Sequence, residues 1–146
     1  MVEGRSPDEA AVALNRAHDA EEAPGRFRKG GKVEDCIFCR IVAGEVPSEI
    51  LYQDDEVIAF RDINPQAPVH LLVVSRKHVE SLLEAEARDG KLLASVFEAV
   101  ASLAEREDIA SSGVRVVTNA GRAAGQEVPH LHFHVLGGRT MSWPPG

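Results

Sequence analysis

The sequence of 146 residues has few cysteines, few aromatic residues and a deficit of positive charge. With only two cysteines and no hydrophobic signal core at the N-terminus, a disulfide framework is not expected, and a cytoplasmic protein is the simplest interpretation. No apolar run approaches the roughly 20 residues of a membrane span, which argues against a membrane partner. Lysine and arginine total 16 against 23 acidic residues, a net charge of −7, so the surface is poorly suited to a nucleic-acid backbone.

Hydrophobic residues make up 44 % of the chain, enough for one globular domain with a real core. Residues 1–33 differ from the rest, because their six acidic and six basic side chains cancel and their apolar content is mostly alanine. We expect this segment to be an N-terminal appendage, mobile or loosely docked, with a short helix from Ser6 to about Asp19 and a basic linker after it. The domain is then expected over residues 34–146.

Hydrophobic periodicity and turn residues predict an α+β domain in this second part. Short apolar runs bounded by turn residues predict strands over residues 50–52, 57–60, 69–74, 114–118 and 131–136. Asp35 is a candidate cap for a short helix that ends at Gly44, and helical signals begin again near His78. An apolar stripe predicts a helix of about four turns that contains Leu92, Leu93, Val96, Phe97, Val100 and Leu103. This order of elements is typical of a mostly antiparallel sheet with packed helices.

Histidine alternates with apolar residues near the C-terminus, at His130, His132 and His134. Because strand side chains alternate faces with period two, the three imidazoles should share one face while the apolar residues between them enter the core. Neighbouring histidines would then have Cα atoms roughly 6.5–7 Å apart. Such a row can bind a metal, or it can carry out nucleophilic and acid–base chemistry.

The loop before this strand favours phosphate chemistry. Residues 121–128 are rich in small side chains, so several backbone N–H groups can approach the start of the strand, an arrangement that suits a bound phosphate. Gly125 in particular permits the close backbone approach that a bound anion needs.

The segment from Gly125 to Leu136, GQEVPHLHFHVL, resembles the signature of the histidine triad (HIT) superfamily. Further matching segments are CIFC at 36–39, AFRDI at 59–63, PQAPVHLLV at 65–73 and RKH at 76–78. Downstream, GGR at 137–139 and WPPG at 143–146 are similar to the histidine triad nucleotide-binding, or phosphoramidase, branch. The resemblance covers residues 34–146. It implies a HIT-like fold with a five-stranded, mostly antiparallel sheet, and a homodimer in which two sheets join as a continuous ten-stranded sheet.

The resemblance also implies roles for individual residues. His132 would be the nucleophile that attacks the α-phosphorus and forms a nucleotidyl-histidine, with His130, His134 and His70 completing the catalytic set. Asp62 would bind the ribose, and Asn119 would help to hold the phosphate. The remaining nucleotide-binding positions are Ile37, Phe38, Phe60 and Ile63 around the purine, and Gly125, Gln126, Glu127 and Val128 along the phosphate. Glu127 stands where members of this branch often carry serine, and we expect only its backbone to matter.

A structural zinc site is a further expectation. Cys36 and Cys39 have the spacing of half a zinc site, which alone is a weak signal. Some members of the family complete such a site with histidines at the positions of His78 and His130, and two cysteines with two histidines make a closed, structural set. The alternative is a pair of reduced core cysteines. Catalysis itself is expected to need no cofactor.

The leading functional interpretation is a purine nucleoside phosphoramidase that releases AMP or GMP. One alternative is a dinucleoside polyphosphate hydrolase of the same superfamily, which the WPPG ending disfavours. Another is a purine-nucleotide-binding module without catalysis, which the intact His132 disfavours. The expected partners are therefore a purine nucleotide and a second copy of the chain.

Overall fold

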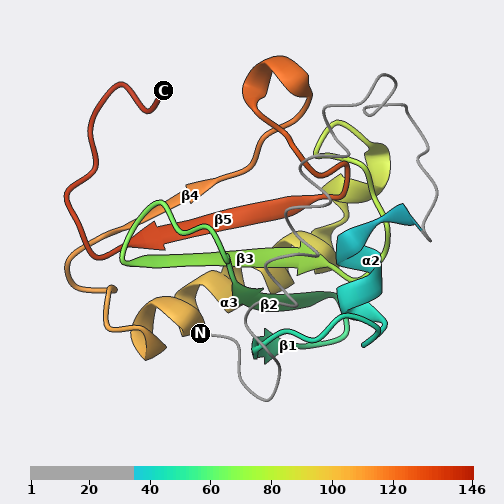
Figure 1. Cartoon of the computed structure of the whole chain (residues 1–146), viewed down its shortest axis with the longest axis horizontal. Coiled ribbons are helices and arrows are strands. Elements are labelled where there is room, and N and C mark those ends of the chain that lie inside the picture. Colours follow the sequence, from blue (N-terminus) through green and yellow to red (C-terminus); the bar gives the residue numbers. More distant parts are fainter. Residues whose placement is uncertain (1–34) are drawn as a thin grey trace.

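The fold is a single five-stranded sheet with helices on both of its faces, as a computed structural model describes it for residues 35–146 (Figure 1). The strand order is β1-β2-β3-β5-β4, and every neighbouring pair is antiparallel. The predicted appendage over residues 1–33, including its helix, lies outside the described residues. Within the described part, no helix is long and apolar enough to cross a membrane.

The five strands lie close to where the sequence predicts them. They are β1 Ile50–Gln53, β2 Val57–Arg61, β3 Val69–Ser75, β4 Val114–Val117 and β5 His132–Gly137. The helical elements are α2 Ile37–Val42 and α3 Gly90–Arg106, with 3-10 turns η2 Ala85–Arg88 and η3 Arg122–Ala124. The α+β prediction is therefore confirmed.

Both helix starts differ from the prediction. The cap of α2 is Cys36 rather than Asp35, because the Sγ atom of Cys36 accepts the backbone N–H of Cys39. The chain after His78 is irregular and forms η2 first, so the predicted helical start there is wrong. The long helix α3 begins only after Asp89, whose carboxylate accepts the N–H of Leu92 at 3.1 Å.

Alternate strand residues enter two separate cores, one on each face of the sheet. On the α3 face, strand residues such as Val57, Leu71 and Val135 pack with helix residues that include Leu92, Val96, Ala99 and Leu103. On the α2 face, Ile58, Phe60, Leu72 and Val74 pack with Ile37, Phe38 and Ile41. Figure 1 shows α3 behind the sheet and α2 near the end at which β5 begins.

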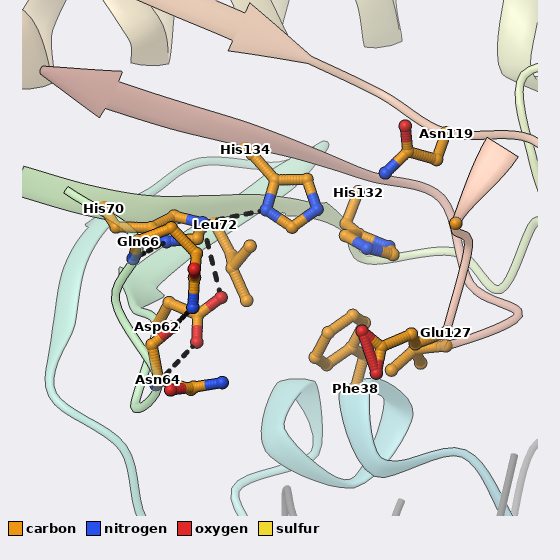
Figure 2. Close-up of a pocket in the computed structure, with 12 residues that line it drawn as sticks. Phe38, Asp62, Asn64, Gln66, His70, Leu72, Asn119, Glu127, His132 and His134 are labelled. Carbon is orange, nitrogen blue, oxygen red and sulfur yellow. Dashed lines mark hydrogen bonds and ion pairs between the residues drawn. The ribbon is translucent and has the colours of Figure 1, made fainter. Parts of the chain in front are cut away.

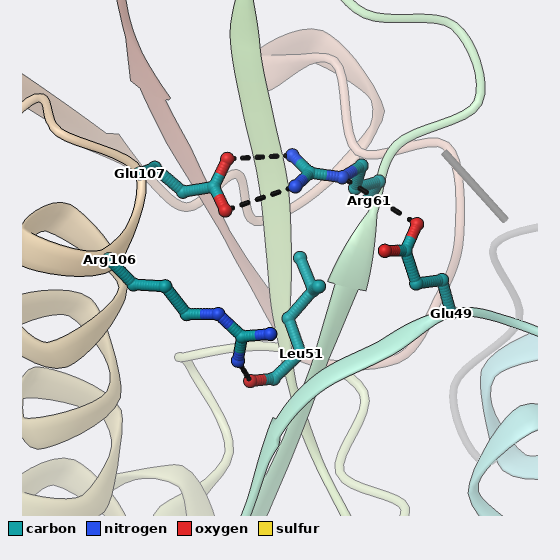
Figure 3. Close-up of polar contacts among 5 residues, drawn as sticks. All are labelled: Glu49, Leu51, Arg61, Arg106 and Glu107. Atoms are coloured by element: carbon teal, nitrogen blue, oxygen red, sulfur yellow. Dashed lines mark hydrogen bonds and ion pairs between the residues drawn. The ribbon is translucent and has the colours of Figure 1, made fainter. Parts of the chain in front are cut away.

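The end of α3 is tied to the sheet by polar contacts (Figure 3). Arg61, the last residue of β2, donates two hydrogen bonds to the carboxylate of Glu107, at 2.8 and 3.0 Å. Arg106 donates to the carbonyl oxygen of Leu51 in β1. Because Arg61 points to the α3 face, the chain that leaves β2 is anchored just before Asp62.

Candidate active site

A pocket of about 200 Å³ opens on the α2 face of the sheet (Figure 2). Its lining consists of Phe38, Asp62, Asn64, Gln66, His70, Leu72, Asn119, Gly125, Glu127, Val128, His132 and His134. These residues come from α2, from β3 and β5, from the loop after β2 and from the glycine-rich loop before β5. The pocket therefore brings together residues that are almost a hundred positions apart in the sequence.

The pairing of β3 with β5 places the histidines. Leu72 lies opposite His134 and Val74 lies opposite His132, so both histidines share the face on which Leu72 and Val74 are buried. Phe133, between them, packs into the core of the α3 face. The predicted division of the strand into a histidine face and an apolar face is seen in the structure. His130 lies just before β5 and is completely buried.

The ring of His132 is fixed in one tautomer. Its Nδ1 atom lies 2.6 Å from the carbonyl oxygen of His130, and since a carbonyl only accepts, Nδ1 carries the hydrogen. The lone pair is then on Nε2. Burial lowers the pKa of His132 to about 4, although the hydrogen bond to His130 acts in the opposite direction. The ring is consequently a neutral imidazole with a free nitrogen at neutral pH.

His70 and His134 form a second, linked pair. The backbone N–H of Gln66 donates to Nδ1 of His70 at 3.0 Å, so the hydrogen of a neutral His70 ring is on Nε2. That Nε2–H donates to Nδ1 of His134 at 2.9 Å, which leaves the hydrogen of His134 on its own Nε2, on the side of His132 (Figure 2). Burial lowers the pKa of both rings, and the nearby Asp62 carboxylate partly offsets this effect.

The loop after β2 forms one end of the pocket. One carboxylate oxygen of Asp62 accepts the N–H of Asn64 at 2.8 Å, and the other lies 3.4 Å from Nε2 of His70. Asn64, Gln66 and Leu72 were not among the predicted site residues. Leu72 could have been found by the period-two rule applied to His70, whereas Gln66 acts through its backbone, which no side-chain pattern reports.

The glycine-rich loop forms the opposite end. Asn119, Gly125, Glu127 and Val128 line the pocket, and Gly125 has a φ of +91° where η3 ends. Gln126 points away from the pocket and braces the loop. Its Oε1 accepts the N–H of Gly121 at 2.8 Å, and its Nε2 donates to the carbonyl oxygens of Glu80 and Val128.

Of the four predicted purine contacts, only Phe38 lines the pocket. Its ring meets the ring of His132 edge-on, with centroids 5.1 Å apart. Ile37 and Phe60 are buried in the core of the α2 face, and Ile63 is partly buried against it. Phe60 meets the ring of Phe38 edge-on, with centroids 5.8 Å apart, and so supports this wall of the pocket.

The predicted metal ligands gather behind the pocket. The ligand atoms of Cys36, Cys39, His78 and His130 all lie within 4.8 Å of one another. His130 Nδ1 is 3.2 Å from Cys36 Sγ and 3.5 Å from Cys39 Sγ, and His78 Nδ1 is 3.1 Å from Cys39 Sγ. A tetrahedral zinc site has sulfur–nitrogen edges of about 3.5 Å, given its usual bond lengths. The four side chains are thus close to the arrangement that zinc requires.

The protonation of this cluster also suits a metal. Nε2 of His130 lies 2.7 Å from the carbonyl oxygen of Ser75, so its hydrogen is there and the Nδ1 lone pair faces the cysteines. The hydrogen bond from Cys39 holds the pKa of the Cys36 thiol well below its usual range, while the same contact raises the pKa of Cys39. One thiolate is therefore already favoured before a cation binds.

Comparison with known proteins was consistent with this geometry. The sequence model of the HIT domain matches residues 43–141. The chain is 48 % identical over 113 residues to an uncharacterized HIT-like protein of Synechococcus elongatus, covering 77 % of this chain and 98 % of that protein. It is 44 % identical over 108 residues to the purine nucleoside phosphoramidase of Escherichia coli, covering 74 % and 91 %. The structure of a HIT family hydrolase from Clostridium thermocellum superposes with a TM-score of 0.72 at 44 % identity, covering 76 % and 96 %.

Proposed function

This chain belongs to the HIT domain family, and from that membership we propose that it hydrolyses purine nucleotides at the α-phosphate, releasing AMP or GMP as a nucleoside phosphoramidase does. It is a hydrolase of that family. The observation that carries the proposal is the Nε2 lone pair of His132, held in a pocket whose opposite ends offer a carboxylate and a glycine-rich loop.

In the proposed reaction, Nε2 of His132 forms a bond to the α-phosphorus while the bond from phosphorus to the leaving nitrogen breaks. The leaving amine keeps the electron pair and takes up a proton. Water then cleaves the bond between phosphorus and His132, which yields the nucleoside monophosphate and restores the neutral ring. The lowered pKa of His132 supports this role, because a protonated imidazole has no lone pair for the attack.

The other pocket residues would bind and orient the nucleotide. The Nε2–H of His134 and the side chain of Asn119 would donate to phosphate oxygens, where charge develops during the transfer, and both residues line the pocket. The carboxylate of Asp62 can accept from ribose hydroxyls. Phe38 supplies an apolar face between these two ends.

The test compares the wild type with His132→Asn in three assays. The wild type should hydrolyse an adenosine phosphoramidate, and labelled adenylate should be recovered on His132 after denaturation without acid. The variant should bind AMP with similar affinity and lose turnover by at least about a thousandfold. Unchanged turnover in the variant would refute the mechanism, and AMP binding without any wild-type turnover would favour a non-catalytic nucleotide-binding module. Faster hydrolysis of diadenosine polyphosphates than of the phosphoramidate would favour the other hydrolase class.

We propose in addition that Cys36, Cys39, His78 and His130 hold a structural zinc ion. A closed set of two thiolates and two imidazoles would supply stability rather than chemistry, because it leaves no open position for substrate. The cluster ties Cys36 and Cys39, at the cap and within α2, to His130 beside β5. Metal analysis of the purified protein should find one zinc per chain, and Cys39→Ser should lose it.

A homodimer is also proposed, joined through β4 into a ten-stranded sheet. β4 is an edge strand, so its outer backbone groups have no partner strand within the described residues. Val116, which is 36 % exposed, points to the α3 face, and Phe97 of α3 is 59 % exposed although it belongs to the predicted apolar stripe. Light scattering should give twice the mass of one chain, and Phe97→Glu should reduce it to one.

A further inference from the structure

We infer that Arg139, which lies outside the pocket, is a positioning residue for the proposed reaction. It holds the loop between β2 and β3 in the place where the backbone of Gln66 fixes the hydrogen of His70. This inference rests on the proposed function, since it assigns the arginine a part in the same site. It is carried by a chain of contacts that runs from the turn after β5 to the histidines.

The first contact joins Arg139 to the loop. Nε and Nη2 of Arg139 both donate to the carbonyl oxygen of Gln66, at 3.3 and 3.1 Å, and Nη1 donates to the carbonyl oxygen of Thr140 at 3.1 Å. The rigid fork of a guanidinium can direct two donors at one oxygen, which the single ammonium of a lysine cannot do in the same way. The guanidinium thus links the backbone of the turn after β5 to the backbone of the loop.

A second observation shows that this approach is built into the turn. Gly138 has a φ of +92°, and a Cβ atom on it would lie 2.9 Å from Cβ of Pro68. Only glycine allows the turn to press so closely on Pro68 in this backbone conformation. The neighbouring pair Val69 and Gly137 belongs to the ladder between β3 and β5. The strand pairing and the close packing of Gly138 on Pro68 therefore hold Arg139 next to Gln66.

The loop that Arg139 holds has two functions in the pocket. It contributes Asp62, Asn64 and Gln66 to the lining. It also supplies the N–H of Gln66 to Nδ1 of His70 and the carboxylate of Asp62, which lies 3.4 Å from Nε2, and these two contacts together hold the hydrogen of His70 on Nε2.

The position of that hydrogen determines what His134 can do. If the loop moves away, Nδ1 of His70 loses its donor and can carry the hydrogen itself. Nε2 of His70 would then accept from Nδ1 of His134, so the Nε2 of His134 on the side of His132 would lose its hydrogen (Figure 2). A donor to the phosphate would become an acceptor. Arg139 consequently acts on the reaction without touching the nucleotide.

The experiment compares Arg139→Ala and Arg139→Lys with Arg106→Ala as a matched control. Arg106 is likewise an exposed arginine that donates to a backbone carbonyl, but it lies on α3. Steady-state hydrolysis of an adenosine phosphoramidate gives kcat and KM. Two-bond ¹H–¹⁵N correlation spectra give the tautomers of His70 and His134, and these spectra require no turnover.

For Arg139→Ala we expect kcat/KM to fall by roughly tenfold to a hundredfold, with kcat contributing to the loss. His70 should change from a pure Nε2–H tautomer to a mixture, and Arg139→Lys should be intermediate in both measurements. Arg106→Ala should change neither. The inference is overturned if Arg139→Ala keeps the wild-type tautomers, or if Arg106→Ala reduces kcat/KM to the same extent. If the wild type fails to hydrolyse the phosphoramidate, the proposed function fails, while the tautomer spectra still decide whether Arg139 controls His70.

Discussion

The ion pair between Arg61 and Glu107 joins β2 to the end of α3, and its loss should destabilise the fold measurably (Figure 3). The two side chains are 28 % and 12 % exposed, so the pair is neither a surface pair nor a fully buried one. Exposed pairs contribute about 0.2–1 kcal/mol, whereas removing one partner of a buried pair costs about 3–5 kcal/mol. We therefore expect Glu107→Ala to lower the free energy of unfolding by about 2 kcal/mol. In this variant the positive charge of Arg61 would still be partly balanced by the carboxylate of Glu49, which lies 3.7 Å from Nε of Arg61.

A double-mutant cycle measures this contribution. Urea unfolding of the wild type, Arg61→Ala, Glu107→Ala and the double variant is followed by far-ultraviolet circular dichroism, and the coupling energy should be about 1–2 kcal/mol. The matched control is the cycle of Arg40 and Glu45, which are 3.7 Å apart with side chains 45 % and 63 % exposed, and which should couple by less than about 0.5 kcal/mol. The reasoning is refuted if the coupling of Arg61 with Glu107 is no larger than that of the control pair.

Three further predictions concern pH, metal and packing. Burial lowers the pKa of His70 and His134, so as the pH falls the unfolded chain binds protons at these rings before the folded chain does. The free energy of unfolding should therefore hold above about pH 6.5 and fall below it, whereas kcat, which depends on the folded enzyme, should stay constant through pH 6.5 and fall only at lower pH. Unchanged stability at pH 5, or a kcat that is already halved at about pH 6.5, would contradict these pKa directions. A strong chelator should lower the Tm by more than about 5 °C, and added zinc should restore it; an unaffected Tm would argue against a structural metal. Gly137→Ala should lower the free energy of unfolding, measured with urea, by about 1–3 kcal/mol. The new Cβ would lie 2.6 Å from Cδ1 of Ile109 and 3.1 Å from the carbonyl oxygen of Gly113. A wild-type unfolding midpoint in the variant would show that these contacts can relax.

Local periodicity was enough to predict the strands and the histidine face of β5. The reason is that a strand's two faces are determined by residues two positions apart, as His132 and His134 show. Helical periodicity placed Phe97 on the apolar stripe of α3, but it did not show whether this side chain serves the core or an interface, and the described residues leave it exposed. Periodicity shows on which face of an element an apolar side chain lies. It does not show whether that side chain is buried by other residues of the same domain.

Contacts between distant segments could not be predicted in this way. Asp35 is the more usual type of capping residue, so the sequence favoured it over Cys36 as the cap of α2. Cys36 belongs to the cluster with Cys39, His78 and His130, which forms only in the folded structure. Gln126 was expected to offer its backbone to the phosphate, and no pattern in the sequence indicated that its side-chain amide contacts three backbone groups within and beyond its loop. The role of Gln66 depends on a backbone N–H directed at His70, and a sequence carries no signal for the direction of a backbone group.

The strand that carries His132, β5, is an interior strand of the sheet and is therefore protected from solvent exchange. It is bordered by β3 on one side and by β4 on the other, so its amide hydrogens are covered by ladders in both directions. Hydrogens of this kind exchange with deuterium mainly when the whole domain opens, whereas the two loops that close the pocket can open by themselves. His132 should therefore stay in register for as long as the domain is folded, and the proposed nucleotide substrate would enter and leave through motions of the loops alone.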